Sequence, residues 1–104
     1  MRVNVNFDKI MKELWQHLSY KNAIVLKLKL EGKSHVEIAR ALGMKLRAVN
    51  GAWGGERLDD SGVMHHLKRC KKALGVETDI ELALLCYERG YVTIEEEGAP
   101  PTAR

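Results

Sequence analysis

Hydrophobic residues recur every three or four positions along most of this chain, a spacing that predicts helices rather than strands. In residues 8–18 the apolar side chains fall on one helical face, and Asp8 stands where an N-cap is expected. The next segment ends in an alternating run that resembles a strand. We nevertheless predict a helix there, because Ser19 suits its N-cap and Gly32 the position just after its C-terminus.

Two Ser/Thr-x-x-Glu sequences, Ser34–Glu37 and Thr78–Glu81, predict capping boxes at the starts of further helices. The first of these helices ends at Gly43, and the second is strongly apolar and ends before Gly90. Apolar spacing predicts two more helices between them, over residues 45–53 and 63–74. The pattern therefore indicates an all-α bundle of five to six short helices.

The chain has 104 residues, which is the size of one domain, and its hydrophobic fraction of 45% is ordinary for a folded protein. No apolar run approaches the roughly 20 residues that span a bilayer. Acidic residues in the first fifteen positions argue against a secretory signal. Two cysteines are too few for a disulfide scaffold. We therefore expect a cytoplasmic protein with no membrane partner.

The net charge of +3 is unevenly distributed. Residues 33–72 hold nine Lys/Arg against four Asp/Glu, whereas residues 73–94 hold one Arg against four Asp/Glu. A basic block of this kind makes nucleic acid the leading candidate partner, although an unevenly charged soluble surface would look the same in composition.

Ala39-x3-Gly43-x5-Val49 is typical of a helix-turn-helix. In that arrangement Ala39 is small because a second helix crosses close to it, and Gly43 supplies the positive φ of a tight turn. Val49 would then pack the second helix, residues 45–53, onto the first. A plain helical hairpin with a glycine turn is the alternative.

A longer series of short motifs extends this pattern over residues 18–94. It starts at Leu18-Ser19-Tyr20-Lys21, continues through Gly32-Lys33-Ser34 to Glu37-Ile38-Ala39 and Leu42-Gly43, and ends at Leu74-Gly75-Val76 and Gly90-Tyr91-Val92. In this order the motifs resemble the DNA-binding domain of LuxR/GerE-type regulators.

The resemblance implies a sequence-specific transcription regulator of bacterial or phage origin that binds double-stranded DNA as a homodimer. It divides the chain into a helical extension over 1–17, the DNA-binding domain over 18–94 and a flexible acidic tail over 95–104. No sensor domain is expected in a chain of this length, so regulation would come from abundance or from a partner regulator.

The stretch from Gly43 to Leu74 is longer than the family's, which leaves two candidate recognition helices. Residues 45–53 continue the helix-turn-helix spacing directly, and this continuity favours them. Residues 61–74 instead place Val63 and His66 where the family has its Val and His. The added segment 54–62 is predicted to be a loop that contacts DNA or a partner, or else a tolerated insertion.

The candidate DNA contacts combine both helices with the start and end of the preceding helix. Arginine and asparagine can read guanine and adenine edges, and lysine and serine commonly hold phosphates. These candidates are Lys33, Ser34, Arg40, Lys45, Arg47, Asn50, Arg57, His66, Lys68, Arg69, Lys71 and Lys72.

The helix over 80–89 is apolar around most of its circumference, and the resemblance implies that two protomers meet there. The expected interface residues are Ile80, Leu82, Ala83, Leu84, Leu85 and Tyr87. The alternative function is a protein-interaction module that binds another regulator through these apolar helices, without specific DNA binding.

Enzymatic chemistry is not expected, because no nucleophile-base arrangement, paired carboxylates or phosphate loop is visible. His66 and Cys70 are four residues apart but lack further ligands, so we expect no metal and no cofactor. Trp15, Trp53 and Cys86 are predicted to lie in the core.

Overall fold

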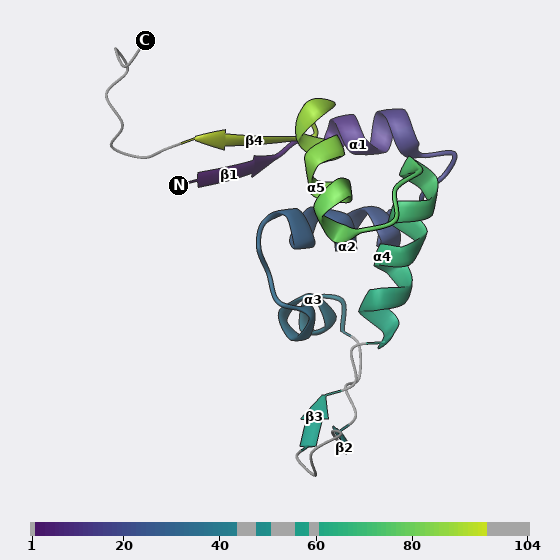
Figure 1. Cartoon of the computed structure of the whole chain (residues 1–104), viewed down its shortest axis with the longest axis vertical. Helices are drawn as coiled ribbons and strands as arrows, with labels where there is room; N and C mark the ends of the chain where they lie inside the picture. The colour runs from purple at the N-terminus through teal and green to yellow at the C-terminus, as the bar shows by residue number, and fades with distance from the viewer. Residues whose placement is uncertain (1, 44–47, 51–55, 59–60, 96–104) are drawn as a thin grey trace.

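The computed structural model describes residues 2–43, 48–50, 56–58 and 61–95 of the chain (Figure 1). In these residues it is mostly helical, as predicted, but it also contains two small antiparallel sheets that were not. The elements are β1 (Arg2–Val5), α1 (Phe7–Leu14), α2 (Tyr20–Leu30), α3 (His35–Ala41), β2 (Ala48–Asn50), β3 (Glu56–Leu58), α4 (Ser61–Leu74), α5 (Asp79–Glu88) and β4 (Val92–Glu95).

Three predicted helix caps are confirmed. The Ser19 hydroxyl accepts from the Asn22 N–H at 3.1 Å and opens α2, which settles the choice between strand and helix in favour of helix. Ser34 and Thr78 both form complete capping boxes, at α3 and α5 respectively. Gly32, immediately after α2, has the predicted positive φ of 87°.

The first helix differs from its prediction. Its N-cap is Asn6 rather than Asp8, since the Asn6 side chain accepts from the Lys9 N–H at 3.1 Å. It ends at Leu14, and the turn that follows brings Leu18 back into the core. Trp15 is 64% exposed, so its predicted place in the core is wrong.

β1 and β4 join the two ends of the described chain in a ribbon, with Val3 opposite Ile94 and Val5 opposite Val92. The valines alternate with polar residues, which is the period-two pattern of a strand. The alternating pattern spans only four residues, however, and the partner strand lies at the other end of the described chain, where Val3 pairs with Ile94. The ribbon projects from the body beside α5 (Figure 1).

The helix predicted over residues 45–53 is wrong where the structure describes it. Ala48–Asn50 forms β2 and pairs with β3, in the segment that was expected to be a loop. Gly51, inside the predicted helix, lowers helix propensity, which weakens the short apolar spacing as a helix signal. The pair of strands β2 and β3 stands beyond the N-terminal end of α4 (Figure 1).

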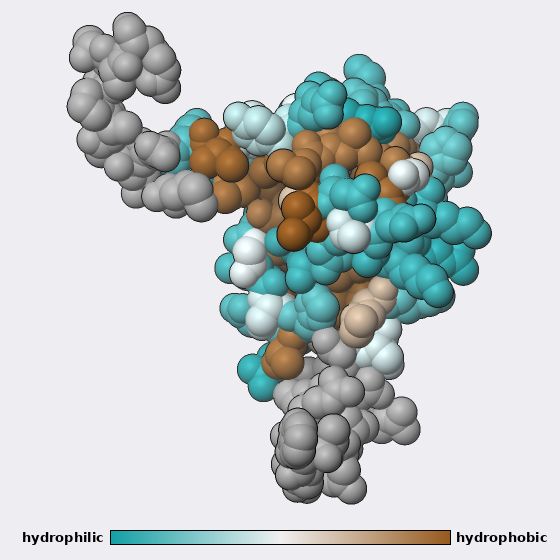
Figure 2. Space-filling view, viewed as in Figure 1, coloured by the Kyte–Doolittle hydropathy of each residue, from teal (hydrophilic) through white to brown (hydrophobic). Residues whose placement is uncertain are grey.

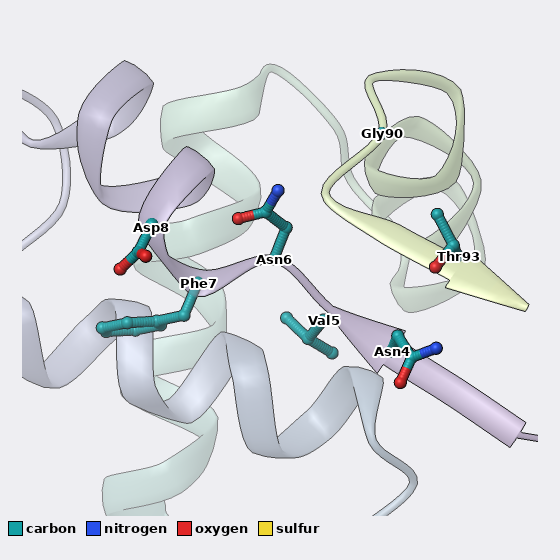
Figure 3. Close-up of a pocket in the computed structure, with 7 residues that line it drawn as sticks. All are labelled: Asn4, Val5, Asn6, Phe7, Asp8, Gly90 and Thr93. Carbon is teal, nitrogen blue, oxygen red and sulfur yellow. The ribbon is translucent and has the colours of Figure 1, made fainter.

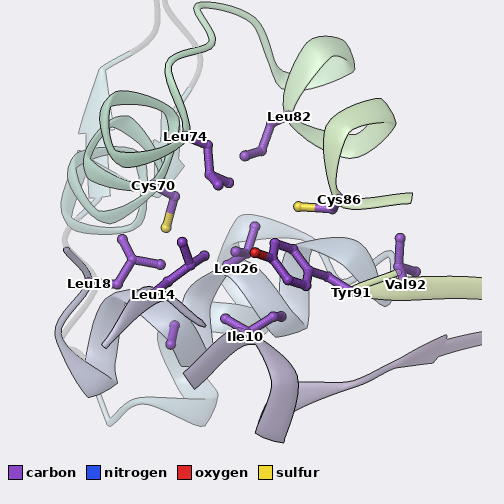
Figure 4. Close-up of a cluster of buried hydrophobic side chains, with 11 residues drawn as sticks. Ile10, Leu14, Leu18, Leu26, Cys70, Leu74, Leu82, Cys86, Tyr91 and Val92 are labelled. Carbon is purple, nitrogen blue, oxygen red and sulfur yellow. The ribbon is translucent and has the colours of Figure 1, made fainter. Parts of the chain in front are cut away.

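Buried side chains form two clusters, and α4 contributes to both. The larger cluster joins α1, α2, α4, α5 and the start of β4 (Figure 4). The smaller cluster joins α2, α3 and α4 and consists of Val25, Ile38, Ala39, Val63 and Leu67. In the part of the chain that the structure describes, no helix has the length and apolar character needed to cross a bilayer.

Candidate nucleic-acid interface

The candidate interface is built on the packing of α4 against α3. Ala39 is fully buried in the cluster with Val63 and Leu67, the first two buried residues of α4. Gly43 ends the α3 segment with a φ of 69°, the conformation that the turn required. The helix that packs against Ala39 is therefore α4, although 45–53 was expected in that place.

One face of α4 is buried against the rest of the protein, and the opposite face is exposed to solvent. Val63, Leu67, Cys70 and Leu74 are buried, at the spacing of a single helical face. The exposed side carries Lys68, Arg69 and Lys72. None of the 14 residues of α4 is acidic, and His65 is exposed on the same side.

Figure 2 shows this arrangement as a hydrophilic flank over α4. A shallow hollow of about 600 Å³ runs along it, between Ser61 and the loop at Val76. Met64 and His65 line this hollow. His65 was expected near the DNA if residues 61–74 are the recognition helix, whereas Met64 was predicted only as part of the apolar repeat of α4. The exposure of Met64 follows from its position beside the buried row on a helical wheel.

His66 was expected at the DNA but is held by the protein itself. Its Nδ1 lies 2.5 Å from Asn22 Oδ1, and an amide oxygen only accepts, so Nδ1 carries the proton. Burial, followed by the nearby charges of His65, Lys21 and Arg69, lowers the pKa of His66. The lowered pKa favours the neutral form of the ring.

The same residue of α2 holds the next turn of α4. The Cys70 thiol donates to the Asn22 carbonyl at 3.3 Å, and Asn22 is 8% exposed. Lys71, another expected DNA contact, pairs with Asp79 of α5 at 3.1 Å. His66 and Lys71 thus fix the position of α4, which leaves Lys68, Arg69 and Lys72 on its open side.

The remaining predicted contacts are divided between described and undescribed parts of the chain. Lys33 and Arg40 are exposed at the two ends of α3. Ser34 is exposed too, but its hydroxyl caps α3, and its backbone N–H lowers the pKa of Glu37 by donating to that carboxylate. Lys45 and Arg47 lie outside the described residues, and Asn50 and Arg57 belong to β2 and β3.

The opposite flank of the molecule is apolar. Ile80, Leu84 and Tyr87 of α5 are 74%, 63% and 57% exposed, and Ala83 lies between them on the same side. Leu82 was expected at this surface but is buried in the larger cluster, against which Leu85 is half-buried. Four of the six expected interface residues are therefore exposed on α5, and the other two face the core.

This apolar side of α5 continues onto the ribbon. A groove of about 340 Å³ between them is lined by Val3, Leu30, Ala83, Leu84, Tyr87, Val92 and Ile94. Figure 2 shows hydrophobic surface over α5 and the adjoining ribbon, on the side away from α4. The acidic residues Asp79, Glu81 and Glu88 border this surface.

A second hollow lies where β1 leads into α1 and approaches Gly90 and Thr93 (Figure 3). Asp8 is the one ionisable residue in its lining, so no pair of groups is present there for acid–base chemistry. Elsewhere, burial raises the pKa of the Cys70 thiol to about 12 and that of Cys86 to about 11, which keeps both thiols protonated. The described residues contain no group of three or more potential metal ligands.

No family model, curated protein or solved structure matches this chain. The resemblance to LuxR/GerE-type domains therefore stays a prediction.

Proposed function

We propose that this chain is a transcription regulator that binds duplex DNA, with α4 as the recognition helix in the major groove. The observation that carries the proposal is the exposed face of α4, which is basic, free of acidic residues and presented by a helix packed against α3 through Ala39. An α-helix fits the major groove of B-DNA, and cations along it neutralise the flanking phosphates.

Within this proposal the residues divide by role. Lys68, Arg69 and Lys72 face the DNA, where arginine can pair with guanine and lysine can hold guanine or phosphate. Lys33 and Arg40, at the ends of α3, contact phosphates and set the register of the protein on the duplex. Both elements belong to the helix-turn-helix arrangement, with α4 in place of the helix expected over 45–53.

The contacts that fix α4 against the rest of the domain support its role as a recognition helix. Asn22 binds two successive turns of α4, through His66 and Cys70, and Lys71 is tied to Asp79. A recognition helix discriminates between bases only when its side chains are held at fixed positions, because a small displacement breaks the hydrogen bonds to base edges.

The exposed strip of α5 favours a homodimer as the DNA-binding form. Its apolar residues stand at 80, 83, 84 and 87, a spacing that reads identically from either end of the helix. Two antiparallel copies of α5 therefore bring Ile80 against the partner's Tyr87, and Ala83 against the partner's Leu84. A two-fold interface requires self-complementarity of this kind, and the small Ala83 at its centre permits close approach.

The same apolar strip supports the second candidate function, in which another regulator binds there and DNA is not contacted. Unpaired apolar surface marks an interface of either kind. Sedimentation of the purified chain separates the two. We expect a dimer in wild type and a monomer in Leu84→Glu, whereas Trp15→Glu, which changes an equally exposed apolar residue at the C-cap of α1, leaves the dimer intact.

A salt titration tests the DNA-binding proposal. Fluorescence anisotropy with a labelled random-sequence duplex is measured at increasing salt. Five exposed cations, three on α4 and two at the ends of α3, predict a log–log slope of about −4 to −5 per protomer, following about −0.9 per neutralised phosphate. A flat response, or no binding at low salt, overturns the proposal.

A matched pair of charge reversals then locates the contact. Lys68→Glu on α4 and Lys12→Glu on α1 change an exposed lysine in the same way and alter the net charge equally. We expect Lys68→Glu to abolish most of the binding and Lys12→Glu to weaken it only slightly. Equal losses would show a general charge effect, and α4 would then not be the reader.

A further inference from the structure

One exposed side chain on the basic flank of α4 is apolar. Met64 is 55% exposed and belongs to neither buried cluster. It lies beside His65 and one helical turn before Lys68, and all three line the same shallow hollow. The core therefore gives no reason for an apolar residue at this position.

Met64 lies at the edge of the exposed side of α4, near the start of the helix. The buried row of Val63, Leu67 and Cys70 fixes the rotation of α4. Met64 and Lys68, four residues apart, lie together on one flank of that row and line the same hollow. Met64 is also in the N-terminal half of α4, and recognition helices contact base edges mainly through their N-terminal residues.

The chemistry of the major groove supplies a specific counterpart. In the major groove, thymine displays a C5-methyl group beside its O4 acceptor. Adenine, guanine and cytosine display hydrogen-bond donors and acceptors there. A methionine side chain cannot use those polar groups well, but its flexible thioether chain packs readily around a methyl group.

We infer that Met64 reads the C5-methyl group of a thymine in the target duplex, beside polar contacts from His65 and Lys68. This inference rests on the proposed function, because it assigns base specificity to the same helix. It names the class of target: duplexes with a thymine at the position facing the first turns of α4.

The test removes the methyl group and nothing else. Duplexes that bind wild type are first selected from a pool with a random core. Each thymine in the best duplex is then replaced by deoxyuridine, one position at a time. We expect one replacement per half-site to weaken binding about fourfold, the change expected for one methyl group lost from a buried contact.

Two variants connect that loss to Met64. In Met64→Ala, the selected duplex and its deoxyuridine form should bind equally, whereas Met64→Leu, which retains an apolar side chain, should keep the difference. Helix content by circular dichroism checks that both variants fold. If Met64→Ala keeps the full thymine preference, another side chain reads the methyl group and the inference is wrong.

The outcomes also separate this inference from the proposal beneath it. Specific binding by wild type without any deoxyuridine-sensitive position overturns the role of Met64 and leaves DNA binding intact. Failure of wild type to bind any duplex at low salt overturns both.

Discussion

The flanks formed by α4 and α5 are both helical surfaces packed on the same core, yet they present opposite chemistry to solvent. The exposed side of α4 is cationic and carries no acidic residue. The exposed side of α5 is apolar and bordered by acidic residues. A polyanion is attracted to the first and repelled by the second, while burial of apolar area favours association only at the second. The two flanks are therefore suited to different partners at the same time.

The sharpest contrast within one helix lies between Leu82 and Leu84, two residues apart on α5. Leu82 is 2% exposed, and its replacement by alanine leaves a cavity in the larger cluster. We expect Leu82→Ala to lower the free energy of unfolding by about 2–5 kcal/mol. Leu84→Ala should change monomer stability by less than about 0.5 kcal/mol. Urea denaturation at a protein concentration below dimerisation measures both, and equal losses would show that Leu84 is not a surface residue.

On the basic flank, Lys68 and Lys71 form a matched pair one turn apart. Lys68 forms no ion pair with a described residue, whereas Lys71 is held by Asp79. We expect Lys68→Ala to weaken duplex binding about tenfold and to make the salt slope shallower by about 0.9. Lys71→Ala should change the slope less. The opposite order, measured by anisotropy, would mean that the Asp79 pair opens when DNA binds.

The burial of His66 against Asn22 makes the stability of the folded protein depend on pH. The folded state lowers the pKa of His66 below its usual value of 6.5, mainly through burial. The unfolded chain therefore binds the proton more readily, so this contribution to stability is complete above pH 6.5 and is lost as the pH falls towards the folded pKa. Denaturation at pH 7.5 and 5.5 should show a smaller loss in His66→Gln than in wild type.

His65→Gln provides the control for that measurement, because His65 is adjacent in sequence but exposed. It should keep most of the pH dependence of wild type, because burial is the main cause of the lowered pKa of His66 and the charge of His65 is a smaller one. If His65→Gln removes the dependence and His66→Gln does not, the proton is taken up at the exposed ring and the role assigned to Asn22 is wrong.

The smallest expected effect concerns the ion pair that joins the two flanks. Lys71 Nζ and Asp79 Oδ1 are 3.1 Å apart, and both side chains are partly exposed. Such pairs contribute up to about 1 kcal/mol, so Asp79→Asn should lower the unfolding free energy by about 0.5 kcal/mol at low salt and by less at high salt. A loss that is unchanged by salt would contradict an electrostatic role for Asp79.

Local signals predicted the starts of α2, α3 and α5. Ser19, Ser34 and Thr78 each act within three residues of their partners, so the sequence alone shows what they bind. Contacts between residues far apart in the sequence could not be predicted in this way. Val5 pairs with Val92 across most of the chain, and no local pattern specifies that pairing.

The candidate site shows the same division. The exposure of Lys68, Arg69 and Lys72 follows from helical periodicity, so these candidates were available from the sequence. The retention of His66 by Asn22, forty-four positions earlier, depends on how α2 and α4 pack. The replacement of 45–53 by α4 beside Ala39 depends on packing too, since both segments carry apolar residues at helical spacing.

The most direct test of the contrast between the two flanks is an amide chemical-shift titration of the isotope-labelled protein with a duplex. The account predicts that the largest shifts fall on residues 61–72 and on the ends of α3, while Ile80, Ala83, Leu84 and Tyr87 stay unperturbed at constant dimer occupancy. Shifts concentrated on α5 and the ribbon, with α4 unaffected, would contradict it.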